Sequence, residues 1–474
     1  MNLSTFFLWP RNFPQPRLAV VFLVFSMGMV FQALIPPFQS PDEFSHVKRA
    51  YLFARGQLFL DRPVGHYAGG QVDVGLLSYF DVYKTLPYTA ENKFSAEEAL
   101  KGEEIKWAGE RRYSPFPGTA YYFPAVYLPQ AAGLWVGERL GWSVESSYEL
   151  ARGLSWVGVV VLLWAALAVF PASPAMLALL ILPMNLLQFV SASLDGLTTA
   201  MTVLAVSLFM RGMCAERAFP RSYSFLMLAC IFLVATSRIH MSPLVFLPLL
   251  VYRVRRDRWI LYSSLLVLAL SVSWILSSMA ATYIARATPS GMSTFQIALF
   301  YIKNPLDLIF SIWGTLQDSR WMEFYGQSFV GVLGWLDAYF SPDFYSVIGT
   351  LLAVLFLASV DPGRELLSAR VALVALSVFC CFLVFFALLL TWNPLSPNVI
   401  AGLQGRYFIG PAVLLAYSLA GKKGVADGAL RKVAVLVLMG MAVYSLQATT
   451  HLVIERYFLA KTADPSSVTV LKEP

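Results

Sequence analysis

Charged residues are scarce in this sequence. Only 13% of its 474 residues are Asp, Glu, Lys or Arg, and 58% are hydrophobic, whereas a soluble domain usually carries about 25% charge. The hydrophobic residues come in runs of about 16 to 22, long enough to cross a hydrocarbon core about 30 Å thick. The net charge of +7 does not indicate nucleic-acid binding, because the cations gather in short loops where they set topology. The sequence therefore predicts a polytopic membrane protein.

Cysteine and histidine are also rare. The four cysteines form no CxxC pair and lie in or beside apolar runs, so we expect buried, reduced thiols. The four histidines form no HExxH motif and have no cysteine cluster beside them, so the sequence predicts no structural metal site. The residues concerned are Cys214, Cys230, Cys380, Cys381, His46, His66, His240 and His451.

The N-terminal region lacks a small-residue cleavage site. Arg11 and Arg17 precede the apolar run 18–35, as in a signal sequence, but Pro36 and Pro37 follow it. We therefore expect an uncleaved first span that runs from the cytoplasm outward.

A long polar segment, residues 36–149, follows the first span, and residues 121–138 within it are ambiguous. If 121–138 do not cross the membrane, the later basic loops face the cytoplasm; if they cross, these loops face outward. The positive-inside rule makes 121–138 a juxtamembrane helix on the outer surface, and its Tyr, Trp and Pro residues suit an interface. The basic residues that decide this are Arg217, Arg221, Arg253, Arg255, Arg256, Arg258, Arg364, Arg370, Lys422, Lys423, Arg431 and Lys432.

The sequence thus predicts an all-α polytopic membrane protein that forms one integral membrane domain over residues 1–474. About eleven spans place the N-terminus in the cytoplasm and the C-terminus outside. Segments 36–149 and 281–344 lie outside, and residues 451–474 form a tail rather than a soluble C-terminal domain. The expected spans are 18–35, then 151–170, 175–192, 195–211, 222–238, 240–252 and 259–280 within 151–280, then 345–360, 371–391, 406–420 and 433–450 within 345–450.

Two adjacent carboxylates, Asp42 and Glu43, follow the first span directly. The stretch is a good helix start, with Ser40 as N-cap, Pro41 at the first helical position and Glu43 completing a capping box. Capping explains Glu43 fully. It explains Asp42 only as a charge near the helix dipole, so a chemical role for Asp42 stays open beside the capping role.

Further polar residues fall at the outer span ends, where burying them is costly. His46 and Arg49 follow Asp42 at i+4 and i+7. The others are Gln188, Ser191, Ser193 and Asp195 at the turn between the third and fourth spans, Arg238 and His240 at the turn between the fifth and sixth, and Gln404, Arg406 and Tyr407 at the start of the tenth. Each has a structural alternative: Asp195 caps a helix, the arginines snorkel to the interface, and the histidines are satisfied polar residues or part of a surface stripe.

Carboxylates and separated arginines at one membrane face suit a particular chemistry. A carboxylate deprotonates an acceptor hydroxyl as that hydroxyl attacks a sugar carbon, and arginines hold the departing phosphate. The donor would be a lipid-linked sugar whose phosphate lies at that depth.

The run from Pro36 to Gly56, PPFQSPDEFSHVKRAYLFARG, resembles the opening signature of a bacterial membrane-protein family catalogued as domain of unknown function 2142. Further stretches match the same family: YYFPAVYLPQAAG (121–133), QFVSASLDGLTTA (188–200), GLQGRYFIGP (402–411) and, more weakly, VLGWLDAYF (332–340). The family name carries no activity.

The layout also resembles the type C glycosyltransferases, which use polyprenyl-phosphate sugars. These enzymes place an acidic motif after the first span, then juxtamembrane helices, then a second acidic residue near the outer end of span 3 or 4. Asp42 and Glu43, residues 121–138 and Asp195 match these features. The resemblance implies that Asp42 is the general base, Glu43 its partner or cap, and Asp195 a catalytic residue that positions acceptor or base.

The same resemblance implies that Arg406, and Arg238 or the pair Arg111 and Arg112, bind the lipid phosphate. Other expected substrate contacts are His46, Arg49, Gln188, His240, Gln404 and Tyr407. Some members of the superfamily need a divalent metal, so such a cofactor stays open, although too few carboxylates cluster here to assign one.

We therefore expect an inverting glycosyltransferase of the bacterial cytoplasmic membrane. It would move a sugar from a polyprenyl-phosphate donor to a cell-envelope glycan or lipid acceptor on the extracytoplasmic face. A flippase for lipid-linked sugars would need mid-membrane ionisable groups and inverted repeats, and neither is found in the sequence. A polysaccharide polymerase or ligase would use the arginines without Asp42, and a non-catalytic scaffold is a further alternative.

Overall fold

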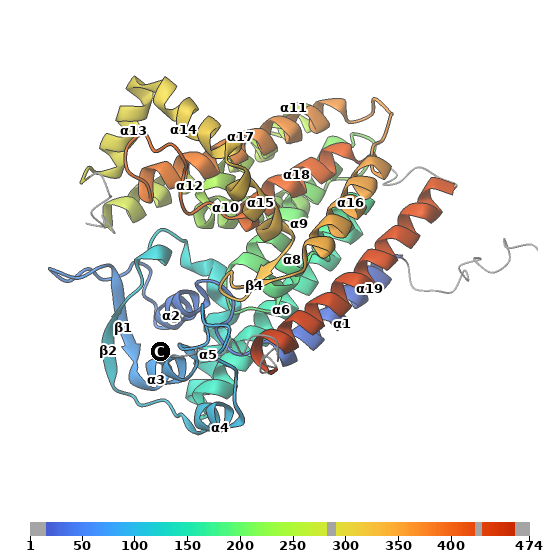
Figure 1. The fold of residues 1–474 in the computed structure, drawn as a ribbon. Coiled ribbons are helices and arrows are strands. Elements are labelled where there is room, and N and C mark those ends of the chain that lie inside the picture. The colour runs from blue at the N-terminus through green and yellow to red at the C-terminus, as the bar shows by residue number, and fades with distance from the viewer. Residues whose placement is uncertain (1–15, 282–290, 422–428, 460–474) are drawn as a thin grey trace, which may run out of the picture.

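A computed structural model describes residues 16–281, 291–421 and 429–459. The described chain is mostly helical, with two small two-stranded antiparallel sheets. It combines a bundle of long helices with an outer lobe, residues 36–143, that covers one end of the bundle (Figure 1). The predicted helical membrane architecture is confirmed at this level.

Long apolar helices make up the bundle. Those long and apolar enough to cross a membrane, within the described residues, are α6 (Val144–Val169), α9 (Asp195–Met213), α12 (Arg258–Ala281), α17 (Leu367–Thr391) and α19 (Ala429–Tyr457). Shorter apolar helices accompany them: α1 (Pro16–Leu34), α10 (Arg221–Ser237) and α16 (Pro342–Ala358). The expected number of eleven spans and their sidedness stay predictions.

Proline interrupts two of the expected spans. Residues 175–192 form two short helices, α7 (Pro174–Leu180) and α8 (Pro183–Phe189). Pro183 has no N–H to continue α7, and Leu182 before it is extended, with ψ 138°, as the proline ring requires. The expected span 240–252 likewise consists of η4 (Ile239–Phe246), which contains Pro243, and α11 (Leu247–Arg255). The tenth expected span is η5 (Gly405–Phe408) followed by α18 (Ile409–Leu419).

The basic loops gather at the end of the bundle away from the outer lobe. There, the Asp361 N–H donates to the Leu419 carbonyl (2.9 Å), and Arg255 Nε donates to the Gly212 carbonyl (2.7 Å). These bonds join loops that the topology argument assigns to a single membrane face. Arg11, Lys422 and Lys423 lie outside the described residues, as does the side chain of Arg431.

The outer lobe has an apolar core of its own, in which Phe38, Tyr51, Tyr79 and Tyr127 are fully buried. Its elements are α2 (Glu43–Phe53), β1 (Gly69–Asp73), α3 (Val74–Tyr83), α4 (Ala96–Glu104), β2 (Arg111–Pro115), η2 (Pro117–Thr119), η3 (Pro124–Tyr127) and α5 (Leu128–Arg139). In the sheet, β1 pairs with β2 in the register Gly69 to Pro115.

The predicted juxtamembrane helix 121–138 consists of η3 and α5. Pro124 and Pro129 keep η3 and α5 as separate short pieces, and α5 packs against α6. A Cβ at Gly133 would overlap the backbone of Ala151, so the two helices approach as closely as glycine allows. At 12 residues, α5 is too short to span a bilayer, as expected.

A second outer segment follows α12. It contains α13 (Thr294–Lys303), α14 (Pro305–Gln317), α15 (Ser319–Val330), β3 (Val332–Leu333) and β4 (Ala338–Tyr339). The end of α19 ties this segment to the outer lobe, because Arg456 donates to both the Leu86 carbonyl (2.5 Å) and Asp337 Oδ2 (2.8 Å). The expected tail is therefore helical up to Tyr457, and residues 460–474 lie outside the described chain.

Candidate active site

The helix at Asp42 and Glu43 begins later than the sequence predicts. Helix α2 starts at Glu43, and Asp42 precedes it in a left-handed conformation (φ 64°) without a capping side-chain bond. Half of the expected capping box forms, since the Ser40 N–H donates to Glu43 Oε2 (3.2 Å). The Ser40 hydroxyl, buried, has no hydrogen-bond partner among the described residues. Ser40 is therefore not the N-cap that the sequence pattern indicates.

Glu43 is buried and connects three parts of the chain. Its Oε1 accepts hydrogen bonds from the Tyr148 hydroxyl (2.9 Å) and the Ala192 N–H (2.6 Å), besides the Ser40 bond to Oε2. Burial raises the pKa of Glu43, although Arg152 and the donated hydrogen bonds oppose that shift. Glu43 thus fixes the start of α2 against α6 and the loop before α9, and it does not line the pocket described below.

Asp42, by contrast, presents its carboxylate to solvent. Its side chain is 60% exposed, and Arg406 Nη2 donates to Oδ2 at 3.1 Å. Partial burial raises the pKa of Asp42, but the charges of Arg406 and Arg238 outweigh this and hold it below its usual value. Asp42 is therefore ionised at neutral pH and free to accept a proton on its exposed side.

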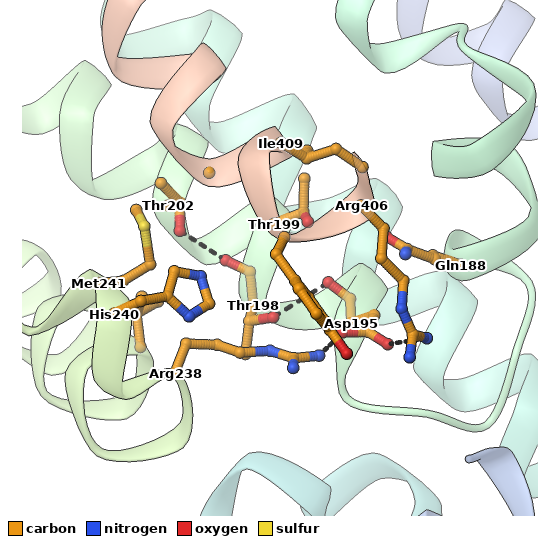
Figure 2. A pocket seen from close by; sticks show the side chains of 13 residues that line it. Gln188, Asp195, Thr198, Thr199, Thr202, Arg238, His240, Met241, Arg406 and Ile409 are labelled. Carbon is orange, nitrogen blue, oxygen red and sulfur yellow. Dashed lines mark hydrogen bonds and ion pairs between the residues drawn. The ribbon is translucent and has the colours of Figure 1, made fainter. Parts of the chain in front are cut away.

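Asp195 lies at the first position of α9 and contacts both arginines of the site (Figure 2). Its Oδ1 pairs with the Arg238 guanidinium, and its Oδ2 lies 3.6 Å from Arg406 Nη1. Asp195 is buried. Arg406 therefore bridges two carboxylates, one buried and one exposed, that are distant in sequence.

Local structure fixes each arginine. Arg238 follows Ser237, the last residue of α10, with φ −134° and ψ 87°, and η4 begins directly after it. Arg406 lies in η5, with its Nε donating to Gln404 Oε1 (2.7 Å). Gly405 before it packs on α15, where a Cβ would overlap the backbone of Tyr325 and Phe329. The Gly405 N–H donates to Ser328 Oγ (2.8 Å). This bond fixes the backbone position from which the Arg406 side chain extends.

A pocket that opens to solvent lies between α9, η4 and η5, and it holds about 390 Å³ of empty space when the open solvent is included. Its polar wall is formed by Asp195, Arg238 and Arg406, and the residues that complete its lining are Gln188, Thr198, Thr199, Thr202, Val234, His240, Met241, Tyr407, Ile409 and Gly410. Figure 2 shows the Arg238 and Arg406 side chains reaching Asp195 from opposite sides, with His240 and Met241 on the side of Arg238. The predicted residues Gln188, His240, Arg406 and Tyr407 thus share one cavity.

His46 lies on α2, which begins at Glu43, and it does not line the pocket. It is buried, and its Nδ1 makes a 2.7 Å hydrogen bond with the Tyr127 hydroxyl. Burial lowers the pKa of His46 to about 3, and the charges of Arg238 and Arg406 act in the same direction, against Asp42. The imidazole is neutral at physiological pH and serves to hold η3 against α2.

Three predicted phosphate or substrate contacts lie elsewhere. Arg49 is fully buried in the outer lobe, where its Nη2 donates to the Leu58 carbonyl (2.5 Å). Arg111 and Arg112 are exposed on β2 and pair with β1. The structure does not bring these residues to the pocket, because the sheet and the apolar lobe core hold them away from it.

Arg152 is a functional neighbour that sequence reasoning missed. It is buried in α6, where Nε donates to the Val190 carbonyl (2.8 Å) and Nη2 to the Ile35 carbonyl (3.1 Å). It therefore ties the end of α1 to the segment that leads to Asp195. The sequence did contain a signal, because Arg152 lies within the expected span 151–170. A charged side chain there is costly unless it is hydrogen-bonded or paired.

The site does not suit a divalent metal. No group of three or more His, Cys, Asp or Glu side chains converges in the described part of the chain. The two carboxylates near the pocket both contact the Arg406 guanidinium, and a cation there would be repelled by that charge. No step of the proposed reaction is therefore assigned to a metal.

A family model described as "Predicted membrane protein (DUF2142)" matches residues 25–415. No curated protein matches the chain. Among solved structures, the chain is similar to one titled "Crystal Structure of ArnT from Cupriavidus metallidurans bound to Undecaprenyl phosphate", with 13% sequence identity and a TM-score of 0.28. That likeness covers 92% of this chain and 77% of the other. A TM-score this low does not establish a shared fold.

Proposed function

The chain belongs to the predicted membrane protein family DUF2142, and we propose that it is an inverting glycosyltransferase that uses a polyprenyl-phosphate sugar donor. The acceptor is a glycan or glycolipid of the bacterial cell envelope. The site faces the extracytoplasmic side of the cytoplasmic membrane, with the basic loops in the cytoplasm.

One observation carries the proposal: Arg406 joins an exposed carboxylate, Asp42, to a buried one, Asp195, at the edge of a pocket. Arg406 Nη1 is buried, makes no hydrogen bond within the described residues and lies 3.6 Å from Asp195 Oδ2, so a phosphate oxygen would share this group with Asp195. Arg238 stands on the other side of Asp195. The two guanidinium groups offset the charges of Asp195 and Asp42, and the guanidinium group matches phosphate geometry.

The reaction proceeds by direct displacement. Asp42 accepts the proton of an acceptor hydroxyl while the oxygen of that hydroxyl attacks the anomeric carbon of the donor. The bond from that carbon to the phosphate oxygen breaks, and polyprenyl phosphate leaves with the electron pair. Arg406 and Arg238 stabilise the charge that develops on the phosphate. Attack opposite the leaving group inverts the anomeric carbon.

The position of the charges favours this chemistry over transport. The ionisable residues of the site come from helix termini: the starts of α2 and α9, the end of α10 and η5 before α18. A transporter would place such groups where helices break at mid-membrane. The break between α7 and α8, within the described bundle, lies at Pro183 and carries no charged side chain.

The test is donor consumption by protein reconstituted in lipid. Wild-type protein is given a panel of labelled polyprenyl-phosphate sugars with cell-envelope acceptors, and we expect release of polyprenyl phosphate and a product of inverted anomeric configuration. Arg406→Gln should weaken donor binding strongly, whereas Arg112→Gln, exposed on β2, should bind as wild type does. A retained configuration, or equal effects of the two substitutions, would contradict the proposal.

A further inference from the structure

Two aromatic side chains, Tyr88 and Trp335, lie near the segment that carries Asp42, although they are far apart in the sequence. Trp335 Nε1 donates to the Phe38 carbonyl (2.8 Å), four residues before Asp42. The Tyr88 and Trp335 ring centroids are 5.8 Å apart, edge to face. Neither residue lines the arginine pocket, so the pair forms a separate surface beside the carboxylate.

The chain segments that carry the two rings are joined by hydrogen bonds and an ion pair. The Tyr88 N–H donates to Asp337 Oδ2 (2.8 Å), and the same oxygen accepts from Arg456 Nη2 (2.8 Å). Arg456 is buried and also binds the Leu86 carbonyl. The loop of Tyr88 and the turn of Trp335 are therefore joined through one ion pair, which fixes the distance between the rings.

Tyr88 is unusual for an exposed loop residue. Its side chain is 71% exposed, and its backbone has φ 64°, a conformation that Gly and Asn adopt more readily than an aromatic residue. Such outliers gather at functional sites. Partial burial and the charges of Asp42 and Asp337 raise the pKa of Tyr88, while Arg406 lowers it, as expected for a hydroxyl near the reacting carboxylate.

The surroundings of Tyr88 do not suit contact with lipid. Lys84 and Glu91 flank it in the chain, and its own backbone is bonded to Asp337. A row of exposed apolar side chains lies elsewhere, on α13 and α14, at Phe295, Ile302, Leu306, Phe310 and Trp313. The Tyr88 ring is therefore exposed to water near the Asp42 carboxylate.

We propose that Tyr88 and Trp335 form the acceptor subsite and bind a pyranose ring by stacking, with one of its hydroxyls directed to Asp42. This rests on the proposed function and names the acceptor class: a sugar with an apolar C–H face. A pyranose offers such a face and a rim of hydroxyls, and an aromatic ring offers a negative face above an apolar body. A few polar groups beside an apolar wall are the usual means of orienting a small ligand.

The test is binding of a panel of methyl hexopyranosides, measured by saturation-transfer NMR without donor. We expect at least one glycoside to receive saturation at its ring C–H protons from wild-type protein. Tyr88→Asn, which suits the left-handed backbone, should weaken binding about tenfold, the loss of about 1.4 kcal/mol of contact. Tyr88→Phe should bind as wild type does, because it keeps the ring.

The matched control is Tyr67→Asn, the same change at another exposed tyrosine of the outer lobe (54% exposed), which should leave binding unchanged. Absence of glycoside binding to wild type, or equal binding by Tyr88→Asn and wild type, would overturn the subsite. Donor consumption is measured on the same preparations. Protein that binds glycoside through Tyr88 but consumes no donor would contradict the transferase and leave the sugar site standing.

Discussion

At the scale of single residues, Asp42 and Glu43 are neighbours with opposite environments. Asp42 is exposed and paired with Arg406, whereas Glu43 is buried and accepts three hydrogen bonds. Adjacent side chains diverge here because Asp42 precedes α2 with φ 64° while Glu43 is already helical. One is therefore suited to proton transfer and the other to holding the site.

The Glu43→Gln substitution separates these roles. An amide keeps one acceptor oxygen but places an NH₂ group among three donors, so we expect destabilisation of about 1–3 kcal/mol. The measurement is the apparent melting temperature in detergent, with Asp42→Asn as the comparison. Glu43→Gln should melt lower than wild type and Asp42→Asn should not; equal melting temperatures for Glu43→Gln and wild type would contradict a structural role for Glu43.

His46 makes stability depend on pH. Burial lowers its pKa in the folded protein to about 3, whereas the unfolded chain takes up the proton near its usual value of about 6.5. Between these values the unfolded state binds more protons, so stability is lost as pH falls, by at most about 1.4 kcal/mol per pH unit. We expect the melting temperature to fall less between pH 7 and pH 5 in His46→Gln than in wild type.

The comparison with His46→Gln isolates this histidine. Glu43, whose raised pKa works in the opposite direction and favours the folded state as pH falls, is common to both proteins. Gln also keeps a hydrogen-bonding partner for the Tyr127 hydroxyl. An identical pH dependence in the two proteins would show that His46 is protonated in the folded state.

At the scale of elements, the contact between α5 and α6 positions the outer lobe on the bundle. Gly133 packs on the backbone of Ala151, and Gly137 on Ser147. Because α5 also packs on α2, the contact between α5 and α6 helps to position Asp42 relative to α9.

Gly133→Ala tests that contact. The added methyl group must displace α6, and such overpacking costs about 1–3 kcal/mol, so we expect a lower melting temperature. Gly349→Ala is the matched control, since a Cβ there meets nothing within 4 Å and alanine favours a helix by about 1 kcal/mol. If both variants melt as wild type does, the close packing of α5 on α6 is not required.

The elements also show where prediction from sequence ends. Apolar runs and positive loops predicted α9, α12 and α17 within a few residues, because hydrophobicity and length decide a span. Helix α6 begins at Val144, before the expected span 151–170, because its first two turns are polar and precede the apolar run. Pro183 splits the expected span 175–192 into α7 and α8. The apolar residues of this span show no periodicity that would predict where the two short helices pack. The register of β1 with β2 depends on contacts within the lobe, which local pattern does not contain.

At the scale of the whole molecule, topology predicted which residues share a face but not which of them touch. Asp42, Asp195 and Arg406 were expected at one level from loop charge alone. Their bridging through a single guanidinium is a tertiary contact between residues as far as 364 positions apart. Arg49 and Arg112 were expected to contact substrate, yet the lobe core and the sheet hold them away from the pocket.

Membrane orientation is testable by cysteine labelling. The native cysteines are buried or half-buried, so single exposed cysteines report sidedness. Val64→Cys in the outer lobe should react with a membrane-impermeant maleimide in intact cells, whereas Arg364→Cys in a basic loop should react only after permeabilisation. The reverse pattern would place the site in the cytoplasm and contradict the positive-inside assignment.

The central claim is that Asp42 is the general base, and the transfer rate of Asp42→Asn at saturating donor tests it most directly. Removing the base should slow transfer by about 10²- to 10⁴-fold, while the donor still binds, because Arg406 and Arg238 remain. Asp61→Asn, an exposed carboxylate of the same lobe, should transfer at the wild-type rate. A folded Asp42→Asn protein that binds donor and transfers sugar at the full rate would contradict the account.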